Sequence, residues 1–285
     1  MKNLFILIIV IPLIGGFCLS AQDTLSNGKA LNFPTRKFGI SIGNSREFTG
    51  IRINFADKNV QRINGLNITF WLKNFENQNA IVNGISVGVI SAAGTMQPIN
   101  IGLLGAGADK NLNGLSVGGI AVGSGGNING LCISGLITMA DGDSSNISGI
   151  TVSGIGIGAN KAINGLAIGG FAVGTDGDIN GFATSLVYVS GKKNFRGMCV
   201  TGGYLTSEIF KGLTIAGYAK TNQMVGLSAA LYNRTEELHG LQVGLLNYAG
   251  NNPKGLRMLP FVNMHLKKAN RVISGLNYQF SNALD

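Results

Sequence analysis

The sequence predicts an all-β fold made of tandem repeats of 14 to 16 residues, and three observations support this prediction. A short unit recurs along the chain: apolar, any residue, glycine, apolar, small or polar, apolar, as in INGLCIS at 128–134 and INGLAIG at 163–169. Apolar and small residues alternate after each glycine, which is the period of a strand with two different faces. The chain also carries 44 glycines, a density that opposes helix formation.

The first 21 residues have the pattern of a secretory signal peptide. Lys2 precedes an apolar run over residues 4–14, and the small residues Ser20 and Ala21 end the segment. The run is shorter than the roughly 20 apolar residues that span a bilayer. Pro12 also interrupts it. We therefore expect residues 1–21 to be removed and the protein to be exported.

Residues 22–47 are expected to form a lead-in with a first strand, and residues 48–285 a single β-repeat domain. We call the glycine at the centre of each unit its anchor, a position that proline takes once. The anchors are Gly50, Gly65, Gly84, Pro98, Gly114, Gly130, Gly149, Gly165, Gly181, Gly197, Gly212, Gly226, Gly240, Gly255 and Gly275.

Apolar residues flank each anchor in a regular pattern. The residue directly after the anchor is apolar in every unit, and small or polar residues such as Ser116 and Thr151 come next. Two places before the anchor the chain is apolar again, as at Ile128 and Ile163. Because asparagine and glycine tolerate a positive φ, the pattern predicts a tight turn at each anchor, with these apolar side chains on one side of it.

Charged residues make up only 12% of the chain, about half of the usual fraction. From residue 84 to 189 every charge lies in the polar linker before the next unit, as at Asp109, Lys161 and Asp176. We therefore expect the flanks of the strands to face something other than water.

Two closures of this pattern fit the sequence. The favoured one is an antiparallel outer-membrane-type β-barrel, whose strands need about 9 to 11 residues and face lipid on one side. The low charge supports it. The alternative is a β-solenoid with one coil per unit, in which Leu, Val and Ile point inward and Ser, Gly and Ala outward. The scarcity of aromatic residues supports this alternative, since Trp71 is the single tryptophan and membrane barrels usually carry aromatic girdles.

The segment GLQVGLLNYAGNNPKGLRMLPFVNMHL at 240–266 resembles the bacterial surface-repeat proteins built from GLQ-apolar-GL-apolar-N units. These proteins end in an L-x-x-L-P-apolar-x-N strand. The resemblance implies a Gram-negative envelope protein, at the surface or in the outer membrane, with no assigned biochemical activity. The last unit, GLNYQF at 275–280, is similar to the carboxy-terminal strand of outer-membrane proteins.

No catalytic, cofactor-binding or metal-binding residue is predicted. His239 and His265 lie in different units without a spaced cysteine or histidine, whereas zinc needs three or four such ligands. The chain has no nucleophile elbow, P-loop or dinucleotide fingerprint in the required setting. Cys132 and Cys199 occupy the same place in units too far apart for a disulfide, so we expect both to be packing residues.

Two polar linkers and the basic residues are candidate binding sites. Asp-Gly-Asp occurs at 141–143 and 176–178; paired carboxylates can hold calcium, although solvation of a loop is their commoner use. The net charge is +9, but most of the cations are divided between the two end regions of the chain. Lys192, Lys193 and Arg196 form the one inner cluster, without an aromatic platform, so lipopolysaccharide phosphates or solvation of a loop are favoured over nucleic acid.

These observations predict a non-enzymatic structural or pore-like protein of the outer membrane or cell surface of a Gram-negative bacterium. Its expected partner is outer-membrane lipid or lipopolysaccharide, with no cofactor, no nucleic acid and no identifiable small-molecule substrate. The alternative is a secreted or surface-attached β-solenoid that acts in adhesion or binding through its Ser/Gly/Ala face.

Overall fold

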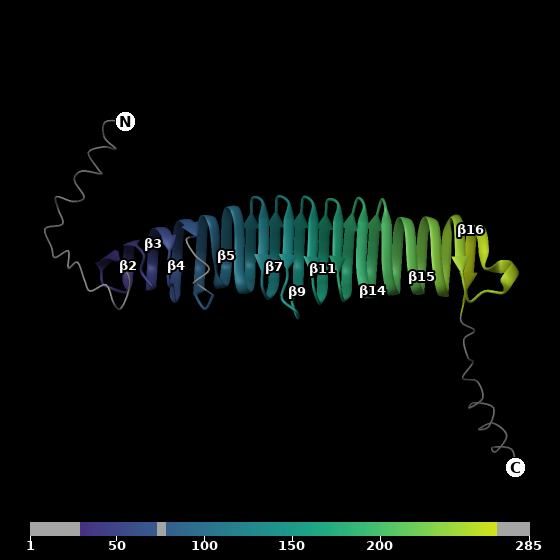
Figure 1. Cartoon of the computed structure of the whole chain (residues 1–285), viewed down its shortest axis with the longest axis horizontal. Coiled ribbons are helices and arrows are strands. Elements are labelled where there is room, and N and C mark those ends of the chain that lie inside the picture. Colours follow the sequence, from purple (N-terminus) through teal and green to yellow (C-terminus); the bar gives the residue numbers. More distant parts are fainter. Residues whose placement is uncertain (1–28, 73–77, 267–285) are drawn as a thin grey trace, which may run out of the picture. The chain divides into compact units, whose positions relative to one another are not determined.

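The computed structural model describes residues 29–72 and 78–266, which belong to two compact units, Met1–Gly135 (unit 1) and Leu136–Asp285 (unit 2). Each unit is a β-solenoid of stacked parallel coils (Figure 1). Strands make up almost all of the regular structure, and the one helical element in the described residues is a single 3-10 turn. The predicted signal peptide and the segment around Gly275 lie outside the described residues.

Unit 1 begins with an antiparallel pair and continues in parallel. Its strands are β1 (Ala30–Pro34), β2 (Phe38–Gly43), β3 (Glu47–Asp57), β4 (Arg62–Leu72), β5 (Ile81–Gly118), β6 (Ala121–Ser124) and β7 (Asn127–Ser134). Strand β1 pairs antiparallel with β2, whereas β2 to β5 pair in parallel. The long β5 winds around more than one coil and pairs in parallel with both β6 and β7.

Unit 2 stacks short and long strands alternately around each coil. The short strands are β8 (Ile137–Ala140), β10 (Gly156–Ala159) and β12 (Ala172–Thr175), and the long strands are β9 (Asn146–Ser153), β11 (Ala162–Gly169) and β13 (Asp178–Ser185). Strand β14 (Tyr188–Thr201) pairs with both stacks, and β15 (Tyr204–Ala249) winds on from it. After the 3-10 turn Lys254–Leu256, β16 (Met258–His265) pairs antiparallel with β15.

The anchor glycines stack directly on each other, one per coil. In unit 2, Gly149, Gly165, Gly181, Gly197 and Gly212 are register partners along successive strands. Gly165 has a φ of +112°, and a Cβ there would lie 2.2 Å from the carbonyl oxygen of Gly149. Only glycine fits these positions of unit 2, because the left-handed backbone and the close approach of the neighbouring coil both exclude a side chain.

The predicted antiparallel barrel is wrong, and the solenoid alternative is confirmed. Period-two alternation occurs in both architectures, so the pattern of the strands could not separate them. The in-register parallel pairing of successive units separates them, because an outer-membrane barrel is antiparallel. The anchors are bends within continuous strands, whereas the sequence predicted tight turns. Gly255 is not an anchor, since it lies in the 3-10 turn with no atom within 4 Å of an added Cβ.

The core is a column of large apolar side chains two residues before each anchor. In unit 1 these are Phe48, Ile63, Val82, Met96, Leu112 and Ile128; in unit 2 they are Ile147, Ile163, Ile179, Phe195, Phe210, Met224 and Leu238. All of them are buried. In unit 2 a second buried column comes from the short-strand side of each coil, with Ile157, Val173, Val189 and Leu205.

The direction of the residues after the anchor is opposite to the one expected for a solenoid. Small or polar residues point inward, so that Ser116, Thr151 and Ala167 are almost fully buried, whereas Ile150 and Leu131 are exposed. The cause is the absence of a turn at the glycine. Strand alternation continues through the bend, which puts the apolar residues before and after the anchor on opposite faces. The Ser/Gly/Ala face expected to be a binding surface is therefore interior.

Candidate functional site

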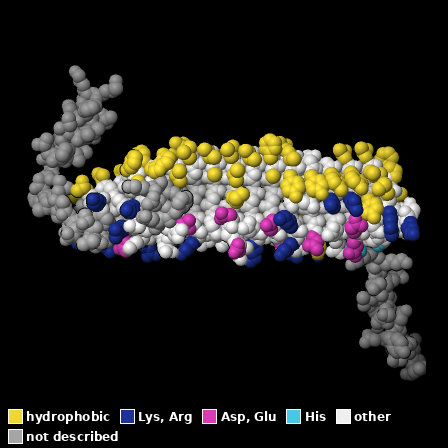
Figure 2. All heavy atoms as spheres, viewed as in Figure 1, with side chains coloured by type: hydrophobic (Ala, Val, Ile, Leu, Met, Phe, Trp, Pro, Cys, Tyr) yellow, Lys and Arg dark blue, Asp and Glu magenta, His cyan; other side chains and the backbone are white. Residues whose placement is uncertain are grey.

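Large apolar side chains line one edge of the coils in each unit. They occupy the outward positions after the anchors and the turn that follows them. We call these side chains the apolar edge: in unit 1, Ile51, Ile53, Ile85, Leu103, Ile120, Leu131 and Ile133; in unit 2, Ile150, Ile155, Ile168, Phe171, Leu186, Val187, Ile215, Leu227, Leu231 and Val243. Figure 2 shows hydrophobic side chains gathered along one side. A monomer in water rarely exposes many large apolar side chains side by side, so the apolar edge of each unit is a candidate interaction site.

Charged residues of unit 2 gather at the opposite turns, where a short strand leads to the next long strand (Figure 2). They include Asp141, Asp143, Lys161, Asp176, Lys192, Lys193, Glu208 and Glu236. The Nζ of Lys192 lies 2.6 Å from Oδ1 of Asp176, and this hydrogen bond, with the charge of Asp176, raises the pKa of Lys192. Both side chains are well exposed, so the pair contributes little to stability. The coil thus has one apolar and one charged edge.

Two cations lie next to each other on the long-strand side of unit 2. Arg196 and Lys211 precede the anchors of neighbouring coils and are register partners on β14 and β15. Both side chains are exposed. Neighbouring strands are about 4.8 Å apart, so these like charges repel unless an anion lies between them.

Four tyrosines form a ladder on the outer face of the short-strand side of unit 2. Tyr188, Tyr204, Tyr218 and Tyr232 follow one another with ring centroids 5.8, 5.0 and 5.0 Å apart; the first and last pairs are stacked, and the middle pair is tilted by 60°. Burial among its neighbours raises the pKa of Tyr218, and the adjacent phenols raise it further. Beyond the ladder, the guanidinium of Arg234 lies 5.6 Å from the ring centre of Tyr248. Tyrosine suits a boundary between apolar and aqueous surroundings, because its ring is apolar and its hydroxyl polar.

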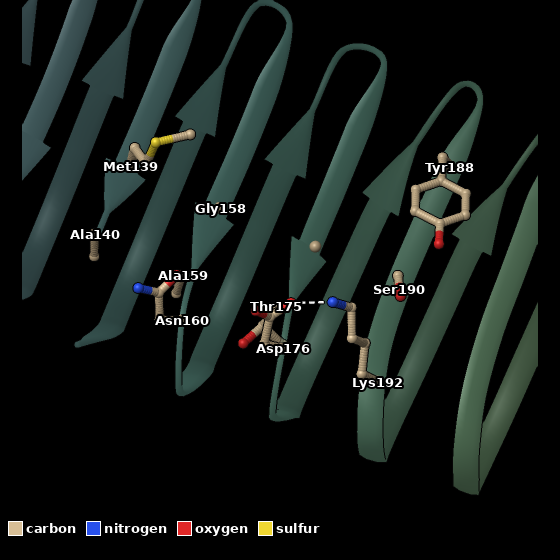
Figure 3. A pocket seen from close by; sticks show the side chains of 11 residues that line it. Met139, Ala140, Gly158, Ala159, Asn160, Thr175, Asp176, Tyr188, Ser190 and Lys192 are labelled. Carbon is tan, nitrogen blue, oxygen red and sulfur yellow. Dashed lines mark ion pairs between the residues drawn. The ribbon is translucent and has the colours of Figure 1, made fainter. Parts of the chain in front are cut away.

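A shallow groove of about 300 Å³ opens beside the first tyrosine of this ladder (Figure 3). Met139 of β8 and Tyr188 of β14 stand at its two sides, and the Lys192–Asp176 pair lies at its charged end. Gly158 and Gly174 form the floor, where an added Cβ would meet nothing closer than 3.8 Å. The groove exists because these two coils carry no bulky outward side chain on their short strands.

Unit 1 contains a buried polar cluster around Arg52, which follows its anchor by two residues. The fully buried guanidinium donates to Oδ1 of Asp57 at 2.6 Å and to Oδ1 of Asn67 at 2.7 Å. Asn54 and Thr69 donate to the same carboxylate. The ion pair is shielded from solvent. Its role is therefore structural, since it supplies charge and hydrogen-bond partners for the buried polar groups of the first coils.

Most of the polar residues singled out from the sequence lie apart in the structure, whereas the two histidines lie close together. Asp176 pairs with Lys192, and Asp178 accepts a hydrogen bond from the amide of Asn194, so both carboxylates have protein partners. The two histidines, which the sequence placed apart, come together because β16 folds back on β15, with ring centroids 6.1 Å apart. Among the described residues, no group of three or more His, Cys, Asp or Glu side chains is placed to hold a metal ion.

The two repeat cysteines are buried and form no disulfide, as the sequence predicted. Burial raises the pKa of the Cys199 thiol to about 12. The apolar edge, the tyrosine ladder and the groove were not identified from the sequence. The ladder had a signal, because tyrosines recur at residues 188, 204, 218 and 232 with the period of the coil.

No family model, no curated protein and no solved structure matches the chain. In the described part of the chain, no helix is long and apolar enough to cross a bilayer. The similarity to envelope proteins with GLQ units therefore stays a prediction from the segment 240–266.

Proposed function

We propose that this chain is an exported, non-enzymatic β-solenoid that attaches to an anionic lipid surface of the Gram-negative cell envelope through its apolar edge. The observation that carries the proposal is the apolar edge itself, with the charged edge on the opposite side of the coil. The predicted signal peptide and the low charge of the chain support export to the envelope.

Lipid is a suitable partner for the apolar edge, because contact with lipid buries apolar side chains and no polar side chain of the edge loses its contact with water. Its side chains are aliphatic or aromatic, and the neighbouring backbone takes part in the parallel ladder. Contact with hydrocarbon therefore leaves few backbone groups without a partner. An amphipathic helix binds the membrane interface on the same principle, with its apolar face in the acyl boundary and its polar face in water.

The groups between the two edges fit the headgroup region of a bilayer. The tyrosine ladder lies on the short-strand side, and Arg196 and Lys211 lie on the long-strand side. Tyrosine is enriched at membrane interfaces, and basic side chains attract anionic lipid. A phosphate placed between Arg196 and Lys211 would relieve the repulsion of these two cations. The favoured partners are therefore anionic phospholipid and lipopolysaccharide.

Vesicle flotation tests this proposal. The exported protein is mixed with vesicles of phosphatidylcholine alone, with added phosphatidylglycerol, or with added lipopolysaccharide, and the floated fraction is measured at low and high salt. We expect binding to all three, stronger with the anionic lipids, and a salt dependence of that extra binding alone. A protein that stays with the aqueous fraction in every case, or that buries its edge in a stable dimer unaffected by lipid, would contradict the proposal.

A further inference from the structure

The groove beside Tyr188 carries a second inference, independent of lipid attachment. Tyr188 is nearly parallel to Tyr204, at 5.8 Å between ring centroids and 4° between ring planes. Its register partner on the other side is Ala172, which has only a methyl group. Figure 3 shows the Tyr188 ring with one face turned outward at the side of the groove, and the glycines of the floor leave room beside it.

The wall of the groove also holds a hydroxyl without a partner. Ser190 lies two residues after Tyr188 on the same outer side of β14 and lines the groove (Figure 3). Only 5% of this residue is exposed, and its Oγ has no hydrogen-bond partner among the described residues. Buried hydroxyls in proteins are almost always paired, so this one marks a place for a polar group of a ligand.

Charged and amide groups complete the polar end of the groove. Asp176 can accept further hydrogen bonds there and Lys192 can donate them, since both side chains are well exposed. Asn160 lies at the same end, with its amide nitrogen 2.7 Å from the carbonyl oxygen of Asp141. The groove thus offers a flat aromatic wall at one place and several hydrogen-bonding groups around it.

We propose that this groove binds a pyranose ring of a carbohydrate. A pyranose has a face of C–H groups that packs on an aromatic face, and a rim of hydroxyls that hydrogen-bond as donors and acceptors. Met139 and Tyr188 stand on strands three steps apart, about 14 Å between backbones, which leaves width for one ring between the side chains. An acyl chain would leave the Ser190 hydroxyl unpaired. The sugar is either part of a free glycan or the headgroup of a glycolipid.

The probe for the test is methyl β-D-galactopyranoside, whose axial hydroxyl leaves a continuous C–H surface on one ring face. Saturation-transfer NMR on the full exported chain reports which sugar protons touch the protein. Sorbitol is the matched control ligand, because it has similar hydroxyls but no ring face. We expect saturation of the protons on one face of the galactoside and none above background for sorbitol. Equal signals for both would overturn the proposal.

The decisive variant is Ala172→Tyr, which adds one ring next to Tyr188 and fills the groove beside it. It sits on an outward position in register with Tyr188, so the fold should be kept or stabilised. We expect at least a tenfold loss of galactoside affinity with unchanged circular dichroism and melting temperature. Tyr188→Phe should bind within twofold of the wild type, and Ser190→Ala severalfold more weakly.

Tyr232→Leu is the matched control, since it removes a ring at the far end of the ladder, and it should bind like the wild type. A folded Ala172→Tyr protein with wild-type affinity would refute the site. Vesicles with and without a galactosyl lipid then separate the two sources of the sugar. Additional recruitment to the galactosyl vesicles that Ala172→Tyr abolishes identifies a lipid headgroup, and binding of the soluble galactoside without such additional recruitment identifies a free glycan. Both outcomes support the groove, and neither depends on the apolar edge, which Ala172→Tyr leaves intact.

Discussion

Replacing three side chains of the apolar edge should remove most of the lipid affinity of unit 2. Phe171, Leu186 and Leu231 expose 56, 68 and 64% of their surface. Complete burial of such a side chain is worth about 1.5 to 3 kcal/mol. Burying the exposed part in lipid is therefore worth about 1 to 2 kcal/mol for each residue. The triple change to serine should cost about 4 kcal/mol of binding, which is about a thousandfold in the partition coefficient.

The assay is vesicle flotation with the triple variant, together with its urea unfolding curve. These side chains are exposed in the folded protein, so the free energy of unfolding should change by no more than about 0.5 kcal/mol per site. The control replaces Asp143, Lys161 and Glu208 of the charged edge by serine, and its partition coefficient should stay within about threefold of wild type. A folded triple variant that partitions like the control would refute the proposed orientation on lipid.

Three further predictions concern the fold itself. Gly165→Ala should destabilise unit 2 by about 3 kcal/mol or more, because its Cβ would lie 2.2 Å from a carbonyl oxygen at a φ of +112°, whereas Gly158→Ala should be tolerated; urea unfolding compares the two. Asp57→Ala should lower the free energy of unfolding by about 3 to 5 kcal/mol, since it leaves the buried Arg52 charge without its carboxylate, and Arg52→Met with Asp57→Leu should recover much of the loss. The Cys199 thiol, with its pKa raised by burial to about 12, should resist a maleimide at pH 8 until urea unfolds the protein, and rapid labelling of the folded chain would contradict its burial. The raised pKa also makes the free energy of unfolding depend on pH. The unfolded thiol ionises at a lower pH than the folded one, so the stabilisation from the protonated Cys199 is complete below pH 9 and declines as the pH rises from 9 towards 12.

The sequence predicts the unit, its period and the position of its glycines, because these follow from local chemistry. Gly149, Gly165 and Gly181 were identified as equivalent positions, and they are register partners in the structure. The parallel or antiparallel direction of pairing is not local. It depends on which neighbour accepts the hydrogen bonds, and alternation along one strand contains no information about that neighbour.

The candidate site could not be predicted for a related reason. An outward column such as Tyr188, Tyr204 and Tyr218 exists only when units stack in register. In the predicted barrel these rings would not be neighbours. The groove is still harder to predict, because it forms where Gly158 and Gly174 have no side chain. Its recognition requires knowing that β10 and β12 lie between Met139 and Tyr188.

The distribution of inward and outward residues is the physical reason for proposing that this solenoid binds a partner. Inside each coil the column after the anchor is filled by small side chains such as Thr151, Ala167 and Ala183, all buried. Such a column contributes less to burial of apolar surface than the leucines and isoleucines of the same strands would. Those larger side chains lie instead on the apolar edge, where water gives them no stabilisation.

Stability of the isolated coil therefore rests on the core column that contains Ile147, Ile163 and Ile179 and on the parallel ladder. The antiparallel β1 and β16 contribute by pairing with terminal coils, which leaves fewer unpaired backbone groups at the ends of the stacks. The apolar edge adds stability only when it meets an apolar surface. Binding should consequently raise the melting temperature, as for any ligand that binds only the folded state. An unchanged melting temperature at saturating lipid would mean that the edge stays in water.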